Sequence, residues 1–251
     1  MVKIENTEVV GIEHAIRGMR NPMNSWDKSD SDWVNYEDWD YGHGVSNGLG
    51  YAYVVNNNDL DLMKKLAKAG SDHRKFMRMI AVYLDITAPL YWWKEFKTYR
   101  HGRKFMDDGD IFEYDDDALE YHIETNSCST MHKIHDKEFT LEDFSCEHLD
   151  VRSKVILETI IEALNRYRDL FVNYNAEDYE IQGCPSKKTY WWQMIQLLPS
   201  SYNQKRTVML NYEVLANMYH SRKNHKLDEW REFCKWIDDL PYSELITGRE
   251  Q

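Results

Sequence analysis

The segment from Val151 to Val172 constrains the fold most, because it carries the cleanest helical pattern in the chain. Its apolar and small residues recur at the spacing of one helical turn, which predicts a helix with one buried face. The residues expected on that face are Val155, Ile156, Thr159, Ile160, Ala163 and Leu164. A chain of 251 residues, 42% of them hydrophobic, is long enough to provide the core that such a face needs.

Helical spacing predicts further helices on both sides of this segment. Asp72 to about Tyr99 reads as helix, with Pro89 either kinking it or starting a second helix. Asp59 is expected to cap a helix over Leu60–Ala69 that stops at the following glycine. The other predicted helices are a short one through His14–Ile16 and the ranges Ser186–Leu198, Asn203–Ser221 and Leu227–Ile237.

Strand signals are weaker and lie near Glu8–Ile12 and Phe139–Phe144. Trp26–Tyr53 is rich in Asn, Asp, Ser, Gly and aromatic residues, which predicts a long irregular loop. Asp107–Glu124 is strongly acidic and poor in aliphatic residues, which predicts a mobile insertion. Together these patterns predict one α+β domain over residues 1–251, mostly helical with a small sheet.

The net charge of −12 argues against duplex DNA or RNA as a partner, since phosphate backbones require clustered Lys and Arg. A small nucleotide in a local basic pocket remains compatible with it. No apolar run approaches the roughly 20 residues of a membrane span, and the N-terminus lacks the apolar stretch of a signal peptide. The four cysteines form no CxxC pair. We therefore expect a reduced, cytoplasmic protein without membrane contact.

The C-terminal third carries the most informative polar pattern. Its successive pieces are Leu198-Pro199, the helical stretch from Asn211 to Asn217, Ser221-Arg222, His225 and Glu229-Trp230. A surface helix with solvated polar residues is one explanation of this pattern. The pattern also resembles the C-terminal motif of the flavin-dependent thymidylate synthases, an α+β family that is mostly helical.

This resemblance implies that Asn211 and Asn217 contact FAD and that Arg222 binds the uracil edge of a nucleotide. The chemistry suits that role, because a fixed guanidinium beside uracil N3 stabilises negative charge on the ring. Such charge makes C5 more nucleophilic. Arg222 is therefore the first catalytic candidate.

Two further stretches carry the resemblance. Gly70-Ser71-Asp72-His73 and the later pair Arg100-His101 are similar to the family stretch that ends in Arg-His-Arg, which implies that His73, Arg100 and His101 face the flavin and Lys97 the nucleotide. An Arg-His pair at a helix end is otherwise a common partner of the helix dipole.

The second stretch, Asn126 to His132, resembles the family segment Asn-Glu-x-Ser-x-Arg-Tyr. It implies substrate contacts from Asn126, Ser127, Cys128 and Ser129, with Ser129 as the second catalytic candidate. A hydroxyl-rich turn can bind phosphate through its hydroxyl and backbone N–H donors, and it can equally serve as a plain helix cap.

Several positions depart from the family pattern. Gly102 is the third residue of the Arg-His-Arg motif, and Ser127 and Met131 replace the Glu and the Arg of the later segment. Ile195 and Glu213 stand where the family has a phosphate-binding and a flavin-binding arginine. The cations considered as replacements are Lys97, Arg103, Lys133, Lys205 and Arg206.

The resemblance implies methylation of dUMP at C5 to give dTMP, with FAD as cofactor and with methylenetetrahydrofolate and NADPH as co-substrates. The family forms homotetramers that share flavin sites between subunits, and it needs no nucleophilic cysteine. One alternative is hydroxymethylation of dUMP. Another is a non-catalytic oligomeric nucleotide-binding protein that has kept the fold.

A metal site is a rival interpretation of one short span, which holds Cys128, His132, His135, Cys146 and His148. Zinc sites usually show tighter paired spacing, such as CxxC or HExxH. The sequence therefore favours ordinary polar and core roles for these residues, and no metal is expected.

Overall fold

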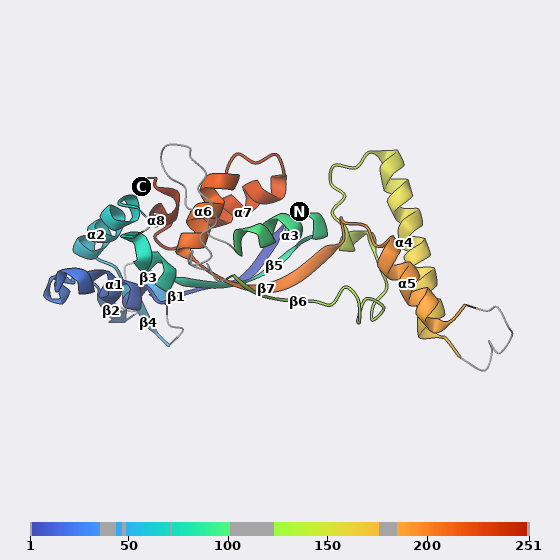
Figure 1. Cartoon of the computed structure of the whole chain (residues 1–251), viewed down its shortest axis with the longest axis horizontal. Coiled ribbons are helices and arrows are strands. Elements are labelled where there is room, and N and C mark those ends of the chain that lie inside the picture. The colour runs from blue at the N-terminus through green and yellow to red at the C-terminus, as the bar shows by residue number, and fades with distance from the viewer. Residues whose placement is uncertain are drawn as a thin grey trace. The chain divides into compact units, whose positions relative to one another are not determined.

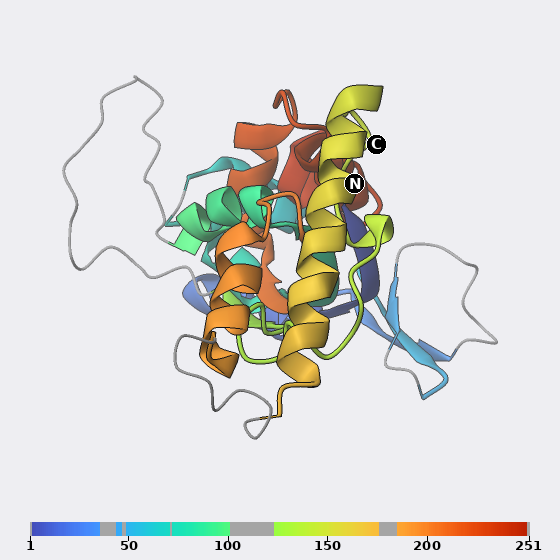
Figure 2. The same cartoon turned by 90° about the vertical axis from the view of Figure 1, so that its right-hand side faces the viewer.

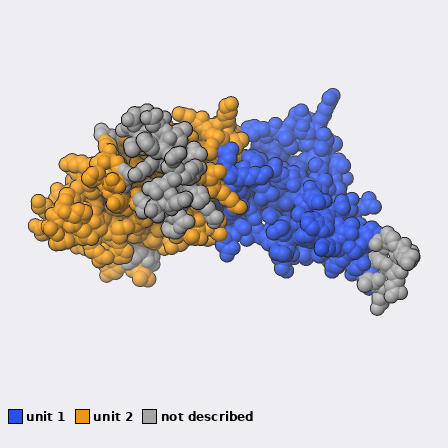
Figure 3. Space-filling model, viewed as in Figure 1, with its two compact units in different colours: residues 1–3, 87–95, 126–206 blue, residues 4–86, 96–125, 207–251 orange. Residues whose placement is uncertain are grey.

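The computed structural model of the chain describes residues 2–35, 44–46, 49–70, 72–100, 123–175 and 185–249. The expected acidic insertion, apart from its last two residues, lies outside these ranges, as do Gly102 and Arg103. The contacts of the chain group into two compact units (Figure 3). Unit 1 comprises residues 1–3, 87–95 and 126–206, and unit 2 comprises residues 4–86, 96–125 and 207–251. The single domain over 1–251 stays a prediction.

The fold is α+β and mostly helical, as the sequence predicts (Figure 1). The helices are α1 Ile12–Arg20, α2 Asn57–Lys68, α3 Leu90–Phe96, α4 Val151–Val172, α5 Lys187–Leu197, α6 Tyr212–Arg222, α7 Asp228–Asp238 and α8 Glu244–Thr247. Short 3₁₀ turns are η1 Asn21–Met23, η2 Trp26–Lys28, η4 Arg74–Met79, η5 Lys97–Arg100 and η6 Leu141–Asp143. No helix in the described ranges is long and apolar enough to cross a membrane.

The strands form two sheets. They are β1 Lys3–Val10, β2 Asp32–Asn35, β3 Gly44–Ser46, β4 Tyr51–Val54, β5 Ala81–Pro89, β6 Glu124–Ser127 and β7 Asn203–Asn211. One sheet has the order β1-β5-β7-β6, and in the other β4 pairs antiparallel with both β2 and β3.

Two predicted helices are wrong over much of their length. The range from Asp72 to Tyr99 is η4, then β5, and becomes α3 only after Pro89, and the first half of Asn203–Ser221 is β7. In both strands the buried residues alternate along the chain, namely Val82, Leu84, Ile86 and Ala88 in β5 and Gln204, Arg206, Val208 and Leu210 in β7. An apolar-rich run can fit both the helical and the strand periodicity. Pairing with neighbouring strands in the sheet then favours the strand.

The predicted order of a strand followed by a helix is confirmed at the N-terminus, but β1 begins earlier than the predicted Glu8–Ile12 and Ile12 already belongs to α1. Gly11 has a φ of 90°, and a Cβ atom there would lie 2.2 Å from the carbonyl oxygen of Met79. Glycine is therefore required by both the left-handed backbone and the close approach of η4. The loop predicted over Trp26–Tyr53 is wrong where β2, β3 and β4 form a sheet, at 32–35, 44–46 and from 51 onward. Phe139–Phe144 contains η6 and ends in one isolated bridge to Tyr202 in place of a strand.

Helix α4 is confirmed with the predicted bounds, but its buried face is only partly the predicted one. Leu164 is buried as predicted, and Ile160 packs partly against the core. Val155 and Ile156 are 55% and 62% exposed, and Leu157 and Ile161 are buried in their place. Figure 2 shows α4 beside α5, and the core of unit 1 forms between them. The core side chains are Ile134, Phe139, Phe144, Leu157, Ile161, Leu164 and Met194. The position of α5 therefore selects which apolar stripe of α4 is covered.

The core of unit 2 is aromatic. The ring of Phe96 stacks on that of Trp230 at 6.3 Å between centroids, and Phe233 meets both rings edge-on. Helix α6 is buried along most of its length, from Tyr212 to Tyr219. A helix buried in this way is surrounded by protein on most sides. Its few charged side chains therefore need partners within the protein.

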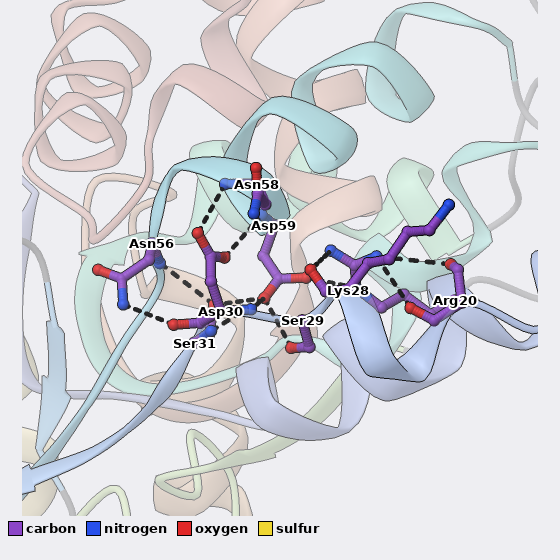
Figure 4. A network of polar contacts seen from close by, with 9 residues as sticks. Arg20, Lys28, Ser29, Asp30, Ser31, Asn56, Asn58 and Asp59 are labelled. Carbon is purple, nitrogen blue, oxygen red and sulfur yellow. Dashed lines mark hydrogen bonds and ion pairs between the residues drawn. The ribbon is translucent and has the colours of Figure 1, made fainter.

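A polar network around the buried side chains of Arg20 and Asp59 holds the N-terminus of α2 (Figure 4). Asp30 accepts hydrogen bonds from the backbone N–H groups of Asn58 and Asp59, at 3.0 and 3.1 Å. These donors belong to the first turn of α2, whose N–H groups have no partner within the helix. The sequence predicts Asp59 as the N-cap, but Asp59 lies inside the helix and Asn56 is the N-cap residue. The cap is supplied from a distant loop.

Asp59 uses its own carboxylate to bind that loop. Its oxygens accept hydrogen bonds from the hydroxyls of Ser29 and Ser31, both at 2.7 Å, and from Nε of Arg20 at 2.6 Å. The backbone N–H groups of Asp30 and Ser31 donate to it as well, at 3.1 Å each. The Arg20 and Asp59 side chains are almost completely buried, so the ion pair depends on this full set of donors.

We expect Asp59→Asn to lower the free energy of unfolding by about 3 kcal/mol, because it leaves the buried Arg20 guanidinium without its charge partner. Urea denaturation followed by circular dichroism measures this change. The control is Asp61→Asn, which removes the same charge from an exposed position of α2 and should change stability by less than about 0.5 kcal/mol. Equal effects of the two substitutions would contradict the assignment.

The same carboxylate predicts how stability depends on pH. Burial by itself raises the pKa of Asp59, but hydrogen bonds from Ser31, Ser29 and Arg20 outweigh burial and hold this pKa below its ordinary value. The stabilisation is therefore complete above about pH 4 and is lost as the pH falls through the folded-state pKa. Below about pH 4, the unfolding free energy of the native chain should drop more steeply than that of Asp59→Asn. If the unfolding free energies of the two proteins, measured by urea titration at matched pH values, fell in parallel, the Asp59 carboxylate would not cause this pH dependence.

Candidate functional site

The start of α6 is built by a strand that turns directly into a helix. Asn211 is the last residue of β7 and the N-cap of α6, and its side-chain oxygen accepts the N–H of Val214 at 3.0 Å. The N–H of Tyr212 donates to the carbonyl of Ile80 at 3.1 Å, which ties this junction to the start of β5. Asn211 therefore has a structural role, and its amide nitrogen is the part of the side chain that remains suited to a ligand. Asn217, one and a half turns later, is half-buried.

Arg222 ends α6 in an aromatic setting. Its Nε donates to the hydroxyl of Tyr99 at 2.6 Å. Its guanidinium lies over the ring of Trp230 at 4.9 Å and over the ring of Tyr99 at 5.4 Å. The two rings contact each other edge-on, at 5.8 Å between centroids. Arg222 is therefore a half-buried cation held in one orientation, as a planar donor to a ligand must be.

Tyr99 and Trp230 are the partners that sequence reasoning missed or left without a role. Tyr99 lies in η5, 123 residues before Arg222 in the chain. Trp230 lies in α7, eight residues after Arg222. The only sequence signal was the proximity of Tyr99 to the Arg100-His101 pair. Spatial contact between η5 and the end of α6 is a tertiary property.

Glu213 is completely buried and forms an ion pair with Arg74, whose side chain is 28% exposed. The distance from Arg74 Nε to Glu213 Oε1 is 2.9 Å. The resemblance expects an arginine at position 213. Here the carboxylate at that position holds a guanidinium that comes from η4, so positive charge is retained nearby from another element. Arg74 was not among the predicted replacements.

The other flavin and nucleotide candidates of unit 2 are less enclosed. His73 and Lys97 are exposed, at the starts of η4 and η5. Arg100 ends η5, and its side chain lies outside the described part of the chain, as does the whole of His101. Unit 2 thus brings Arg222 together with Tyr99, and Glu213 with Arg74, while the remaining assignments stay predictions.

The substrate candidates Asn126, Ser127, Cys128 and Ser129 belong to unit 1 and are all exposed. The hydroxyl of Ser129 accepts the N–H groups of Met131 and His132, at 3.3 and 2.9 Å. This is the turn-capping role that the sequence left open as an alternative. The hydroxyl oxygen is therefore committed to the turn, and only its proton is available to a ligand.

The backbone of Cys128 is fixed to β7 on both sides. Its N–H donates to the carbonyl of Lys205 at 3.0 Å, and its carbonyl accepts from Nε2 of Gln204 at 2.6 Å. Gln204 also accepts two hydrogen bonds from the buried Arg206, whose guanidinium lies over the ring of Trp93 at 4.3 Å. Arg206 is thus occupied within the protein, which makes it a poor replacement for a phosphate-binding arginine.

Ile195 packs against the apolar core of unit 1, so a hydrophobic contact stands where the resemblance expects a cation. The rival metal interpretation requires a cluster of ligand side chains. Within the described ranges, no group of three His, Cys, Asp or Glu side chains is placed to hold a metal ion. His135 lies against the ring of Phe171 at 4.6 Å, and Cys146 packs on the same core as Ile195.

Comparison with known proteins identifies the fold. No protein-family model and no curated protein matches the sequence. Two solved structures of the flavin-dependent thymidylate synthase ThyX from Helicobacter pylori, both with FAD and dUMP, are similar to the chain. Their TM-scores are 0.57 and 0.56, and each is 13% identical to this chain. Both matches cover 99% of this chain, and they cover 98% and 100% of the respective solved chains. The chain therefore has the fold of these synthases along its whole length, and its chemistry rests on its own residues.

The ion pair between Arg74 and Glu213 should show coupling in a double-mutant cycle. Arg74→Met should cost about 2 kcal/mol, because it removes a cation from a fully buried carboxylate. Adding Glu213→Leu should recover at least about 1 kcal/mol of that loss. Lys75→Met removes a charge from an exposed position of η4 and serves as the control, with an expected change below about 0.5 kcal/mol. Additive effects in urea denaturation would show that the pair contributes no coupling.

Proposed function

We propose that the chain binds FAD beside a uracil nucleotide and modifies the base at C5. The simplest form of this reaction is methylation of dUMP to dTMP, with methylenetetrahydrofolate as one-carbon donor and NADPH as reductant. The observation that carries the proposal is the fixed guanidinium of Arg222, in a chain that shares its whole fold with synthases solved with FAD and dUMP.

Arg222 supports the chemistry through its geometry. The Tyr99 hydroxyl accepts a hydrogen bond from Nε and so helps to fix the plane of the guanidinium, whose parallel N–H groups match the edge of a pyrimidine in geometry. A planar donor held in advance stabilises negative charge on uracil without having to reorganise during the reaction. The base then becomes more nucleophilic at C5, and no cysteine nucleophile is required.

The residues present fit a flavin in part. Asn217 is half-buried on α6, Asn211 keeps its amide nitrogen, and Arg74 brings a guanidinium next to position 213. These side chains offer the amide and guanidinium donors that flavin oxygens require. Flavin, when bound, supplies the redox chemistry, while the protein binds and orients the substrate. Further flavin contacts from His73, Arg100 and His101 belong to the same proposal.

The proposal extends to assembly and to the product. By the same likeness we propose a homotetramer in the cytoplasm, with sites shared between subunits, and a hydroxymethylated product as the variant of the reaction. A non-catalytic nucleotide-binding protein is the second candidate function. The observation that favours it is Ile195, whose burial against the core removes a phosphate-binding cation.

The first experiment separates an enzyme from a non-catalytic relative. Protein purified without added cofactor should be yellow or should take up FAD with the visible absorbance of a bound flavin. A mixture with dUMP and methylenetetrahydrofolate should then oxidise the reduced flavin and form dTMP. A protein that binds dUMP but takes up no flavin would contradict the proposed enzyme and support the non-catalytic candidate.

Arg222→Ala tests the mechanism directly. Flavin binding should survive, and the dUMP-dependent oxidation of reduced flavin should fall about 100-fold, because a preorganised charge-stabilising donor is lost. Arg222→Lys should also be impaired, since it keeps the charge but lacks the planar fork. Lys223→Ala changes the charge of the neighbouring exposed position and should leave the rate unchanged. An unaltered rate in Arg222→Ala would remove this residue from the mechanism.

A further inference from the structure

Unit 2 contains a cavity of about 280 Å³ whose lining residues lie far apart in the sequence. They come from α2, η4, α6, α8 and the two residues after α8, and these elements contact one another. Figure 1 shows α2, α6 and α8 near one another. The charged and polar part of its lining comprises Lys64, Lys68, Arg74, His220, Glu244 and Arg249. The apolar part comprises Ala67, Ala216, Leu245 and Ile246. The cavity therefore combines a basic lining with small apolar walls.

The charge of this lining is opposite to that of the whole chain. Four of its side chains are cationic and one is a carboxylate, in a protein whose net charge is −12. The cations come from three separate parts of the chain, so local sequence composition does not explain their convergence. A basic cavity on an acidic protein concentrates positive potential where an anion can enter.

Lys64 and Lys68 place two positive charges on one face of α2. They lie four residues apart, one helical turn, and both line the cavity. His220 lies in the same positive field. Burial lowers its pKa, and the charges of Lys223 and Arg74 lower it further.

Acidic partners orient three of the four cations. Arg74 uses Nε to donate to Glu213, and Arg249 uses one terminal nitrogen for Asp238 at 3.3 Å. Lys64 lies 3.5 Å from Glu244. A guanidinium carries five N–H donors, so one acid partner leaves further donors for a ligand. Held in this way, arginine presents the bidentate edge that phosphate oxygens accept.

We propose that this cavity binds the phosphate of a small phosphorylated molecule. The anion-binding side chains are Lys64, Lys68, Arg74 and Arg249, and the apolar walls contact the organic part of the ligand. Gly248, at a φ of 69°, turns the chain after α8 and so brings Arg249 to the cavity. The phosphate can belong to the diphosphate of a dinucleotide cofactor or to a free phosphorylated metabolite. The dinucleotide source rests on the proposed function, in which Arg74 also serves the flavin, whereas the metabolite source does not.

Isothermal titration calorimetry with inorganic phosphate, pyrophosphate and AMP tests the proposal. The variants are Lys68→Gln and Arg249→Gln. The matched control is Lys65→Gln, at an exposed position of α2 outside the cavity. Pyrophosphate should bind the native chain and the control equally, and each cavity variant should lose on the order of tenfold in affinity with its charge-assisted contacts. Affinity should also fall as salt rises.

The result that would overturn the proposal is the absence of binding by all three probes at about 0.15 M ionic strength, or affinities that are equal in all variants. A repeat with FAD distinguishes the two sources of phosphate. Competition between FAD and pyrophosphate, together with weaker FAD binding by both cavity variants, supports the dinucleotide. Undiminished pyrophosphate binding by FAD-saturated protein supports a separate metabolite. A protein that takes up no flavin but binds pyrophosphate would contradict only the proposed function.

Discussion

The junction where β7 becomes α6 is the constraint on which the candidate chemistry of unit 2 depends. Asn211 caps the helix, the N–H of Tyr212 binds the carbonyl of Ile80, and the buried Glu213 binds Arg74. Three consecutive residues thus fix where α6 begins and how it is rotated. Every side chain farther along the helix, including Asn217 and Arg222, inherits its direction from this point because a helix is a rigid element.

The two ends of α6 handle charge in different ways. At its start, a buried carboxylate holds Arg74, and the pair avoids the cost of an isolated buried charge. At its end, Arg222 rests on the rings of Trp230 and Tyr99, and the Tyr99 hydroxyl accepts one of its hydrogen bonds. A stacked guanidinium keeps its charge with little rotational freedom. The aromatic core of unit 2 thereby orients a cation as well as stabilising the fold.

The basic cavity adds a second use of the same principle. Its cations are separated in sequence and are brought together by the packing of α2, η4, α6 and the end of the chain. Acidic residues behind or beside them hold their direction, as Glu213 does for Arg74. An overall charge of −12 therefore says little about any one surface of this protein. Local potential is set by which side chains the fold assembles.

The sequence by itself determined the α+β class, the ranges of α4, α5 and α7, and the likeness that singled out Arg222, since these rest on long periodic runs and on residues close together in the chain. Only the tertiary structure decided that β5 and β7 are strands, because apolar runs that fit two periodicities are settled by their neighbours in a sheet. It also decided which face of α4 is buried, that Asp30 caps α2, and that Tyr99 and Arg74 accompany Arg222 and Glu213. Such partners lie far apart in the chain, and their contact is a consequence of packing that no local pattern contains.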